Sequence, residues 1–167
     1  PFIMHQTFRR IWGAPLAEQV KALRDPEFRA TLLAEEPDYP AGEIIEMLCA
    51  GYHKMFSLGE QPNYEPVPEA SAKAIAERTG RHAREVVLDW MLERDGKALL
   101  YFPLMNYHCG SLADVETMLT HPNTAFGLSD GGAHCGIICD ASFPTTLLTH
   151  WGRDRTRGRK LPLEWLV

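Results

Sequence analysis

The sequence predicts an α/β fold, because helical and strand-like patterns alternate along a chain of 167 residues. The main observation is a strand–helix–strand run over residues 97–129, about the minimum length of a right-handed parallel crossover. The second is that amphipathic segments with apolar residues at helical spacing precede this run. The third is a strand-like stretch that ends in Ser129-Asp130 and a glycine-rich turn, the place where α/β proteins bind ligands.

Length and composition suit a single globular domain with a hydrophobic core. Hydrophobic residues make up 45% and charged residues 23% of the chain, and both values are ordinary for globular proteins. The net charge of -5 does not favour nucleic acid or an anionic membrane as a partner. Because no apolar run approaches a membrane span and no signal peptide is visible, we expect a cytoplasmic protein. The four cysteines form no dense framework, so we expect reduced thiols.

The first third of the chain predicts helices. Leu16, Val20 and Leu23 recur at helical spacing, and Asp25-Pro26 has the form of an N-cap followed by the first helical residue. Residues 44–55 are compatible with a short strand or a helix, and we favour a strand over residues 43–48. Residues 57–68 contain three prolines and predict a connecting loop, which we interpret as a surface excursion of one continuous domain.

The second half predicts two helices and then the crossover. A short alanine-rich helix over residues 69–78 should end at Gly80, and a longer amphipathic helix should follow it. Residues 97–104 predict a buried strand with Pro103 near its end. A capping pattern at Ser111 opens a helix whose inward positions are Leu112, Val115, Met118 and Leu119. Residues 124–129 predict the next strand.

A parallel crossover has a geometric consequence for the loops that follow its two strands. Both loops, residues 105–110 and residues 130–140, should open at the same edge of the sheet. Polar and titratable side chains would therefore converge where α/β folds place chemistry. The side chains concerned are Asn106, Tyr107, His108, Cys109, Asp130, His134 and Cys135.

Three kinds of chemistry are compatible with the turn at Asp130. In metal-assisted hydrolysis, Asp130 would take a proton from the attacking water and His134 would bind the substrate or an oxyanion. Alternatively Gly127-Leu-Ser-Asp-Gly131 matches the nucleophile elbow of serine hydrolases, with Ser129 as nucleophile, although no good helix start follows it. A purely structural interpretation remains for Asp130, since Asp-Gly is a common turn.

The third kind of chemistry is a zinc site built from histidine and cysteine. His108-Cys109 and His134-Cys135 could supply ligands from adjacent loops, with Cys139 beside them, although no familiar zinc spacing is present. Elsewhere, the basic run at residues 153–160 is compatible with binding an anionic group, but we expect it to be a solvated turn.

Two segments resemble the late barrel region of the amidohydrolase superfamily. They are Asn123-Thr-Ala-Phe-Gly-Leu-Ser-Asp-Gly-Gly-Ala-His134 and Cys139-Asp-Ala-Ser-Phe-Pro-Thr-Thr-Leu-Leu-Thr-His-Trp-Gly-Arg-Asp-Arg155. Leu23-Arg-Asp-Pro-Glu-Phe-Arg29, Tyr64-Glu-Pro66 and Asp95-Gly-Lys-Ala-Leu-Leu-Tyr101 are also similar to that family. The chain is most similar to the N-acyl-D-amino-acid deacylase (D-aminoacylase) group, over most of its length.

This resemblance implies a (β/α)₈ TIM-type barrel with zinc at the carboxyl ends of its strands. It implies that Asp130 ends the eighth strand, handles the catalytic proton and approaches the metal. The family's early H-x-H pair, its bridging ligand and its two later histidines have no counterpart here, and His5 lies in no recognisable ligand context. We therefore expect residues 1–167 to be a partial barrel domain, the C-terminal portion, inactive by itself. The apolar ending at Val167 and the start at Pro1 point the same way.

The resemblance implies a zinc-dependent hydrolase that cleaves the amide of N-acyl (D-)amino acids. Asp130 is the candidate catalytic residue and metal ligand, while His134, Tyr107 and Asn106 are candidate substrate contacts. The open sheet edges of a partial barrel lead us to expect a homo-oligomer. The alternative from another class is a non-catalytic α/β module for binding or assembly.

Overall fold

The computed structural model describes residues 1–37, 39, 43–107, 109–127 and 140–167. These residues form two compact units, Pro1–Leu104 and Met105–Val167. The proline-rich loop expected at residues 57–68 lies inside the first unit. None of the described helices combines the length and the apolar character needed to cross a bilayer.

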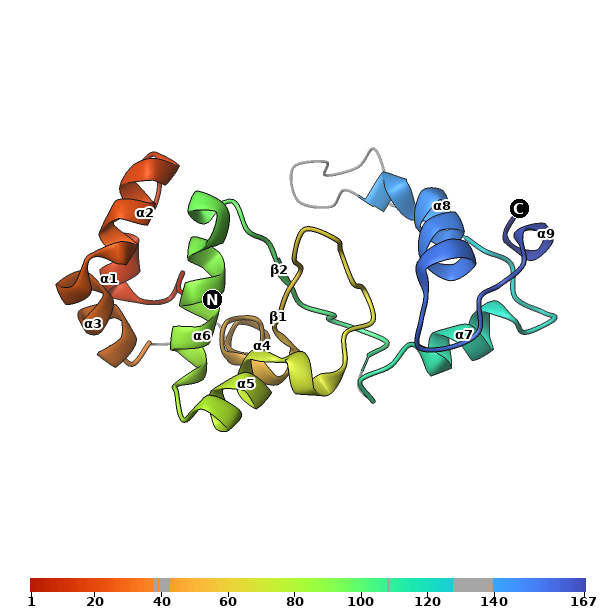
Figure 1. Ribbon diagram of the computed structural model, residues 1–167, viewed down its shortest axis with the longest axis horizontal. Coiled ribbons are helices and arrows are strands. Elements are labelled where there is room, and N and C mark those ends of the chain that lie inside the picture. Colours follow the sequence, from red (N-terminus) through yellow and green to blue (C-terminus); the bar gives the residue numbers. More distant parts are fainter. Residues whose placement is uncertain (38, 40–42, 108, 128–139) are drawn as a thin grey trace. The chain divides into compact units, whose positions relative to one another are not determined.

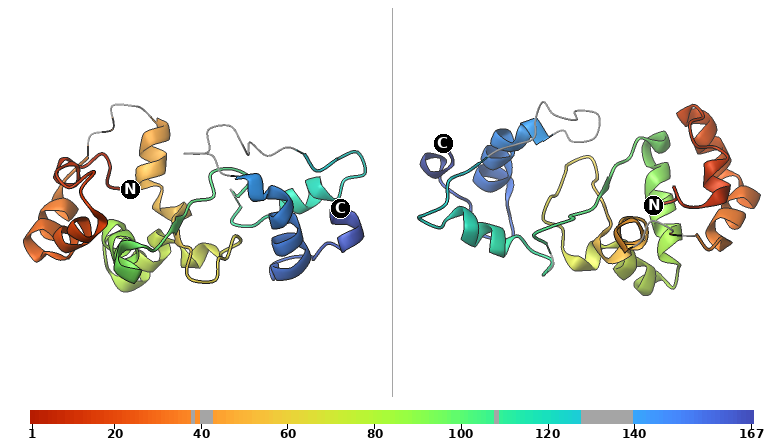
Figure 2. Two further views of the ribbon diagram at one scale, coloured as in Figure 1. Left: turned by 90° about the horizontal axis from the view of Figure 1, so that it is seen from above. Right: turned by 180° about the vertical axis from the view of Figure 1, so that it is seen from behind.

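The first unit is mainly helical (Figure 1). Its regular elements are α1 (Gln6–Arg9), α2 (Leu16–Arg24), α3 (Pro26–Ala34), α4 (Glu43–Ala50), β1 (Phe56–Ser57), α5 (Ala72–Thr79), α6 (Ala83–Leu92) and β2 (Leu100–Tyr101). Short 3₁₀ turns occur at Tyr52–Lys54, Pro68–Ala70 and Glu93–Gly96. Helices α5 and α6 lie side by side in both views of Figure 2, and α2 packs against α3 and α6.

The helix boundaries follow the capping residues of the sequence. The Asp25 carboxylate accepts a hydrogen bond from the Phe28 amide at 2.8 Å, and Pro26 opens α3, as predicted. The Ser71 hydroxyl caps α5 by accepting from the Ala74 amide at 3.3 Å. Gly80 ends α5 in the left-handed conformation, with φ of 65°, which a glycine adopts without steric cost.

The core of the first unit lies between these helices. Val86, Val87 and Leu88 of α6 are almost fully buried, which confirms the predicted amphipathic helix. The buried residues of this core are Phe2, Phe8, Leu23, Leu32, Met55, Ala72, Ala76, Val86, Val87 and Leu88. Asp89 of α6 accepts a hydrogen bond from Arg29 of α3 at 2.6 Å, and this ion pair links the two helices.

The strand predicted at residues 43–48 is wrong, because these residues begin α4. Its two isoleucines favour a strand, but Ile45 and Cys49, four positions apart, face inward in a helix. The pattern is too short to distinguish the two periods, and helix-forming Met, Leu and Ala complete it.

The predicted parallel crossover is also wrong for the described part of the chain. Residues 97–104 contain only the two-residue strand β2, which pairs antiparallel with β1 through Phe56↔Tyr101 and Ser57↔Leu100. Pro103, two residues later, has no N–H to extend the pairing. Residues 124–127 form no strand, and residues 128–129 lie outside the described part. The described chain is therefore helix-rich with one small antiparallel sheet, and neither parallel strands nor a TIM barrel is seen in it.

The second unit is built around one long helical segment, in blue in Figure 1. Its elements are α7 (Ala113–Leu119), a 3₁₀ turn (Asp140–Ser142), α8 (Phe143–Thr146), a π-helix (Leu147–Asp154) and α9 (Leu163–Leu166). The buried core consists of Leu147, Trp151, Leu161 and Leu166. Leu112, Val115 and Leu119 of the α7 region pack against it as predicted, whereas Met118 faces outward and is 47% exposed.

Candidate functional site

The sequence-predicted site residues divide into two groups. Asp130 and His134 lie outside the described residues, as do Ser129, His108, Cys135 and Cys139. Asn106, Tyr107 and Cys109 are described. The expected convergence of the two loops at one sheet edge therefore has no support among the described residues, which contain no parallel strands.

The loop from Asn106 to Gly110 has a defined backbone at its two ends. Asn106 is exposed and has a left-handed backbone with φ of 58°, a conformation that asparagine tolerates better than most residues. Tyr107 is 3% exposed. The Gly110 amide donates to the Tyr107 carbonyl at 3.2 Å, and Gly110 is itself left-handed with φ of 66°. The loop thus turns tightly and leaves Asn106 outward next to a buried tyrosine.

Arg157 binds both ends of this loop. Its Nη1 donates to the Tyr107 hydroxyl at 3.1 Å and to the Gly110 carbonyl at 2.9 Å. A guanidinium nitrogen carries two hydrogens in a fixed plane, so one Nη1 can serve two acceptors. A residue about 50 positions away in sequence therefore fixes the loop.

Arg155, two residues before Arg157, is buried to about 2% exposure. Its guanidinium donates to the Glu116 carboxylate on α7 and, at 3.2 Å, to the Arg159 carbonyl. It also stacks over the Trp151 ring, 4.5 Å from the ring centroid. These contacts neutralise the buried charge and hold the segment after the π-helix against α7.

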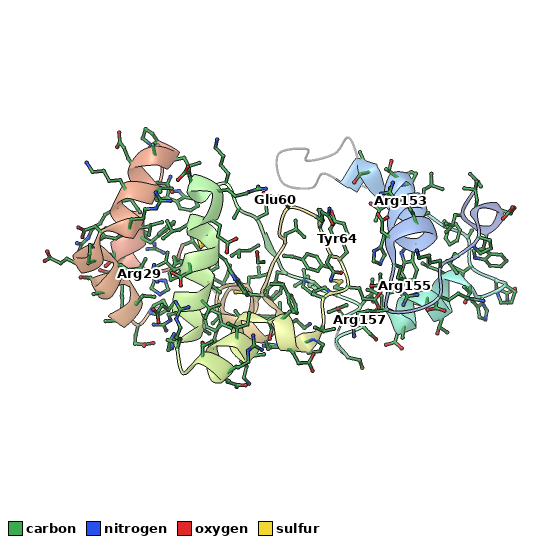
Figure 3. All side chains as sticks on the ribbon, in the orientation of Figure 1. Arg29, Glu60, Tyr64, Arg153, Arg155 and Arg157 are labelled. Atoms are coloured by element: carbon green, nitrogen blue, oxygen red, sulfur yellow. The ribbon has the colours of Figure 1, made fainter. Side chains whose placement is uncertain are left out.

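The basic run at residues 153–160 is thus only in part the solvated turn that we expected. Figure 3 labels three of its arginines along the segment that continues from the blue helix. The side chains of Arg153 and Arg159 are 71% and 62% exposed, which fits that expectation. The expectation is wrong for the buried Arg155 and for the half-buried Arg157. The two inner arginines of the run are the ones that face inward, whereas Arg153 and Arg159 at its ends face solvent.

The charges of this region shift the pKa of two carboxyl groups. The hydrogen bond from Arg155 lowers the pKa of Glu116. Burial acts to raise this pKa, whereas the positive charges of Arg155 and Arg159 lower it further. Arg159 Nε lies 3.5 Å from the same carboxylate. The adjacent Arg153 lowers the pKa of Asp154 through its hydrogen bond. Both carboxylates are therefore ionised at neutral pH.

The first unit contains a second polar cluster, around His5. This side chain is fully buried beside the Phe2 ring, whose centroid is 5.1 Å away, and neither ring nitrogen has a hydrogen-bond partner among the described residues. Desolvation, followed by the positive charge of Arg84, lowers the pKa of His5. His5 is therefore neutral at neutral pH.

Arg84 and Glu35 connect the cluster around His5 to the helix ends nearby. Arg84 donates to the Glu35 carbonyl at 2.8 Å and to the Glu36 carboxylate at 3.0 Å. The Glu35 carboxylate accepts from the Thr7 amide at 2.9 Å and from the Gln6 amide at the start of α1. Although desolvation acts to raise the pKa of Glu35, the hydrogen bonds from Thr7 and Gln6 lower it.

The zinc that the family resemblance implies has no set of ligands among the described residues. Nowhere in residues 1–37, 39, 43–107, 109–127 and 140–167 do three histidine, cysteine, aspartate or glutamate side chains come close enough to hold a metal ion. Cys49 is buried and Cys109 is exposed, and both are free thiols. The described residues do not fit zinc on their own.

Comparison of the chain with models of protein families, with curated proteins and with solved structures gives no match in any of the three. Sequence reasoning did not identify Arg155, Arg157 or Glu116 as members of one cluster, because ion pairs between residues far apart in the chain leave no local pattern.

Proposed function

We propose that this chain is the C-terminal part of a zinc-dependent amidohydrolase that cleaves the amide of N-acyl (D-)amino acids. The observation that carries the proposal is the sequence Ser129-Asp-Gly-Gly-Ala-His134, with its flanking segments Asn123–Leu128 and Cys139–Arg155. A carboxylate followed by glycines and a histidine combines a proton carrier with room for a substrate next to the backbone. The TIM-type barrel and a cytoplasmic location belong to the same proposal.

Asp130 carries the proton in the proposed reaction. Its carboxylate takes a proton from the attacking water and delivers it to the nitrogen of the leaving amine, so that it begins and ends the cycle ionised. His134 and the exposed Asn106 contact the substrate, and the candidate Tyr107, which is buried, supports Asn106 from beside it. In the described part, the outward Asn106 beside the anchored Tyr107 supports this assignment, because substrate contacts need side chains held at fixed positions.

An activity assay tests the proposal. The protein from the longest reading frame that carries these residues should be incubated with N-acetyl derivatives of several D-amino acids and of their L-enantiomers, beside the 167-residue chain alone. We expect the longer protein to release free amino acid and to prefer the D-series, and the chain alone to release none. If the longer protein hydrolyses no amide in either series, the proposal is wrong and a non-catalytic binding or assembly module is the better account.

A further inference from the structure

We propose that Arg157 is a positioning residue for the substrate loop, which we define by its described residues Asn106, Tyr107, Cys109 and Gly110. In this proposal Arg157 touches no reacting atom. It holds the buried Tyr107 and thereby sets the place of the exposed Asn106, which meets the substrate, and this role rests on the function proposed above. The geometry that carries the inference is the pair of hydrogen bonds from one guanidinium nitrogen to the Tyr107 hydroxyl and to the Gly110 carbonyl.

Two separate acceptors make Arg157 a clamp rather than a single contact. One acceptor is a side-chain atom near the start of the substrate loop and the other is a backbone atom at its end. The loop backbone also closes on itself through the Gly110 amide and the Tyr107 carbonyl, 3.2 Å apart. These contacts restrain Tyr107 and Gly110, and a restraint that exists before binding lowers the entropy lost when a substrate binds.

The backbone of Asn106 shows why such a clamp is needed. Its φ of 58° is uncommon for a residue other than glycine and persists only when the surroundings hold it. Tyr107 is the next residue, and the Arg157 clamp holds it by its hydroxyl. Without the clamp, Asn106 can relax to an ordinary backbone conformation, and its exposed side chain then points elsewhere.

Arg157 is itself held in place by the segment that carries it. Arg155, two residues earlier, is buried against Glu116 and Trp151, and the Arg155 amide donates to the His150 carbonyl at 2.9 Å. The segment after the π-helix is therefore a rigid support. Functional side chains on rigid supports keep their geometry better than those on free loops.

Two measurements on the longer protein test the clamp, one without activity and one with it. The first is the alkylation rate of Cys109, an exposed thiol inside the substrate loop, measured by peptide mass spectrometry with the buried Cys49 as an internal reference for unfolding. The second is the separation of KM from kcat on an N-acetyl-D-amino acid. The variants are Arg157→Gln, Arg157→Lys and Tyr107→Phe. The matched control is Arg153→Gln, an exposed arginine of the same basic run that pairs with its neighbour Asp154.

We expect Arg157→Gln to raise the Cys109 rate at least about threefold, since hydrogen bonds that restrain the loop are lost. We also expect KM to rise about tenfold with a smaller change in kcat, because a misplaced contact weakens substrate binding. The Cys109 alkylation rate and the KM of Arg157→Lys should lie between those of Arg157→Gln and the unsubstituted protein. Lysine keeps the positive charge but lacks the planar guanidinium that serves two acceptors. Arg153→Gln should change neither quantity.

The outcomes separate the inference from the proposed function. A lower kcat at constant KM, or an unchanged Cys109 rate, would overturn the positioning role while hydrolysis by the unsubstituted protein still stood. No hydrolysis by the unsubstituted protein would overturn both the proposed function and the substrate role of the clamp. If Arg157→Gln does not fold, Tyr107→Phe removes only the hydroxyl acceptor, and it must raise the Cys109 rate and KM for the inference to stand.

Discussion

Arg155 and Glu116 form an ion pair across 39 residues of sequence, from the end of the π-helix to α7. The Arg155 side chain is 1% exposed and that of Glu116 is 23% exposed, so the carboxylate is a counter-charge of a buried guanidinium. The pair joins the two sides of the core of the second unit. It also keeps the neighbouring Arg157 at the loop that carries Asn106 and Tyr107.

Removing the carboxylate should destabilise the second unit strongly. Glu116→Ala leaves the buried Arg155 charge without its partner, and the expected loss of unfolding free energy is about 3 kcal/mol. The matched control is Glu164→Ala, an exposed acid on α9, for which a change within about 0.5 kcal/mol is expected. Urea unfolding followed by circular dichroism measures both. Equal effects of the two substitutions would contradict the role of this pair.

The same pair should make stability depend on acid. Arg155 lowers the pKa of Glu116 in the folded protein. The contribution of the ion pair to the unfolding free energy is therefore complete above the ordinary pKa of a glutamate, about 4.3. It is lost as pH falls through the lowered pKa of Glu116 in the folded protein. Glu116→Gln, which does not titrate, should therefore narrow the difference in unfolding free energy between neutral and acidic pH. Urea titrations over that pH range measure it, and parallel curves for the two proteins would rule out the linkage.

The helices were the most predictable part of the fold. Asp25-Pro26, Ser71 and Gly80 determine helix ends through contacts within three or four residues, and the apolar positions of α6 define its buried face. The strands were not predictable in the same way, because pairing depends on distant segments. Phe56-Ser57 pairs with Leu100-Tyr101, more than forty residues away in the sequence. Nothing local to either segment shows that the pairing is antiparallel.

The candidate site could be predicted only at the level of residue type. The glycine-rich turn at Asp130 and the loop at Asn106 were visible because acids and amides beside glycines form a local pattern. The anchoring of Tyr107 by Arg157 was not visible, since the basic run by itself shows only charge. Whether an arginine faces water or a carboxylate is decided by the helix that packs against it, here α7 with Glu116.

Gly158 should not tolerate a side chain. A Cβ atom at this position would lie 2.4 Å from the guanidinium carbon of Arg155, which Glu116 and Trp151 hold in place. We expect Gly158→Ala to cost about 1–3 kcal/mol of unfolding free energy, through displacement of Arg155.

The matched control is Gly127→Ala, where no atom of the described residues lies within 4 Å of the added carbon. This substitution should be neutral or stabilise the protein by about 0.5 kcal/mol, because alanine restricts the unfolded chain. Thermal unfolding of the two variants distinguishes them. A Gly158→Ala protein as stable as the unsubstituted chain would show that Arg155 can move without loss.

His5 should make the first unit sensitive to mild acid. Burial lowers its pKa in the folded state, so the unfolded chain binds a proton more readily, and stability decreases as pH falls below the ordinary histidine pKa of about 6.5. The decrease ends once pH is below the pKa of the folded state. His5→Leu removes this titration from a buried position, whereas His53→Leu changes an exposed histidine. Only His5→Leu should flatten the pH dependence of unfolding between pH 7 and pH 5, and an equal slope in all three proteins would contradict the assignment.

The central claim is that Asp130 carries the proton in amide hydrolysis, and the direct test is an Asp130→Asn substitution in the longer protein. Turnover of an N-acetyl-D-amino acid and zinc content by mass spectrometry should be measured on the same samples, with Asp114→Asn, an exposed aspartate on α7, as the matched control. We expect Asp130→Asn to lose activity by at least about 100-fold, because general acid–base catalysis contributes this much, while zinc content stays largely intact. Near-normal turnover in Asp130→Asn would contradict the account.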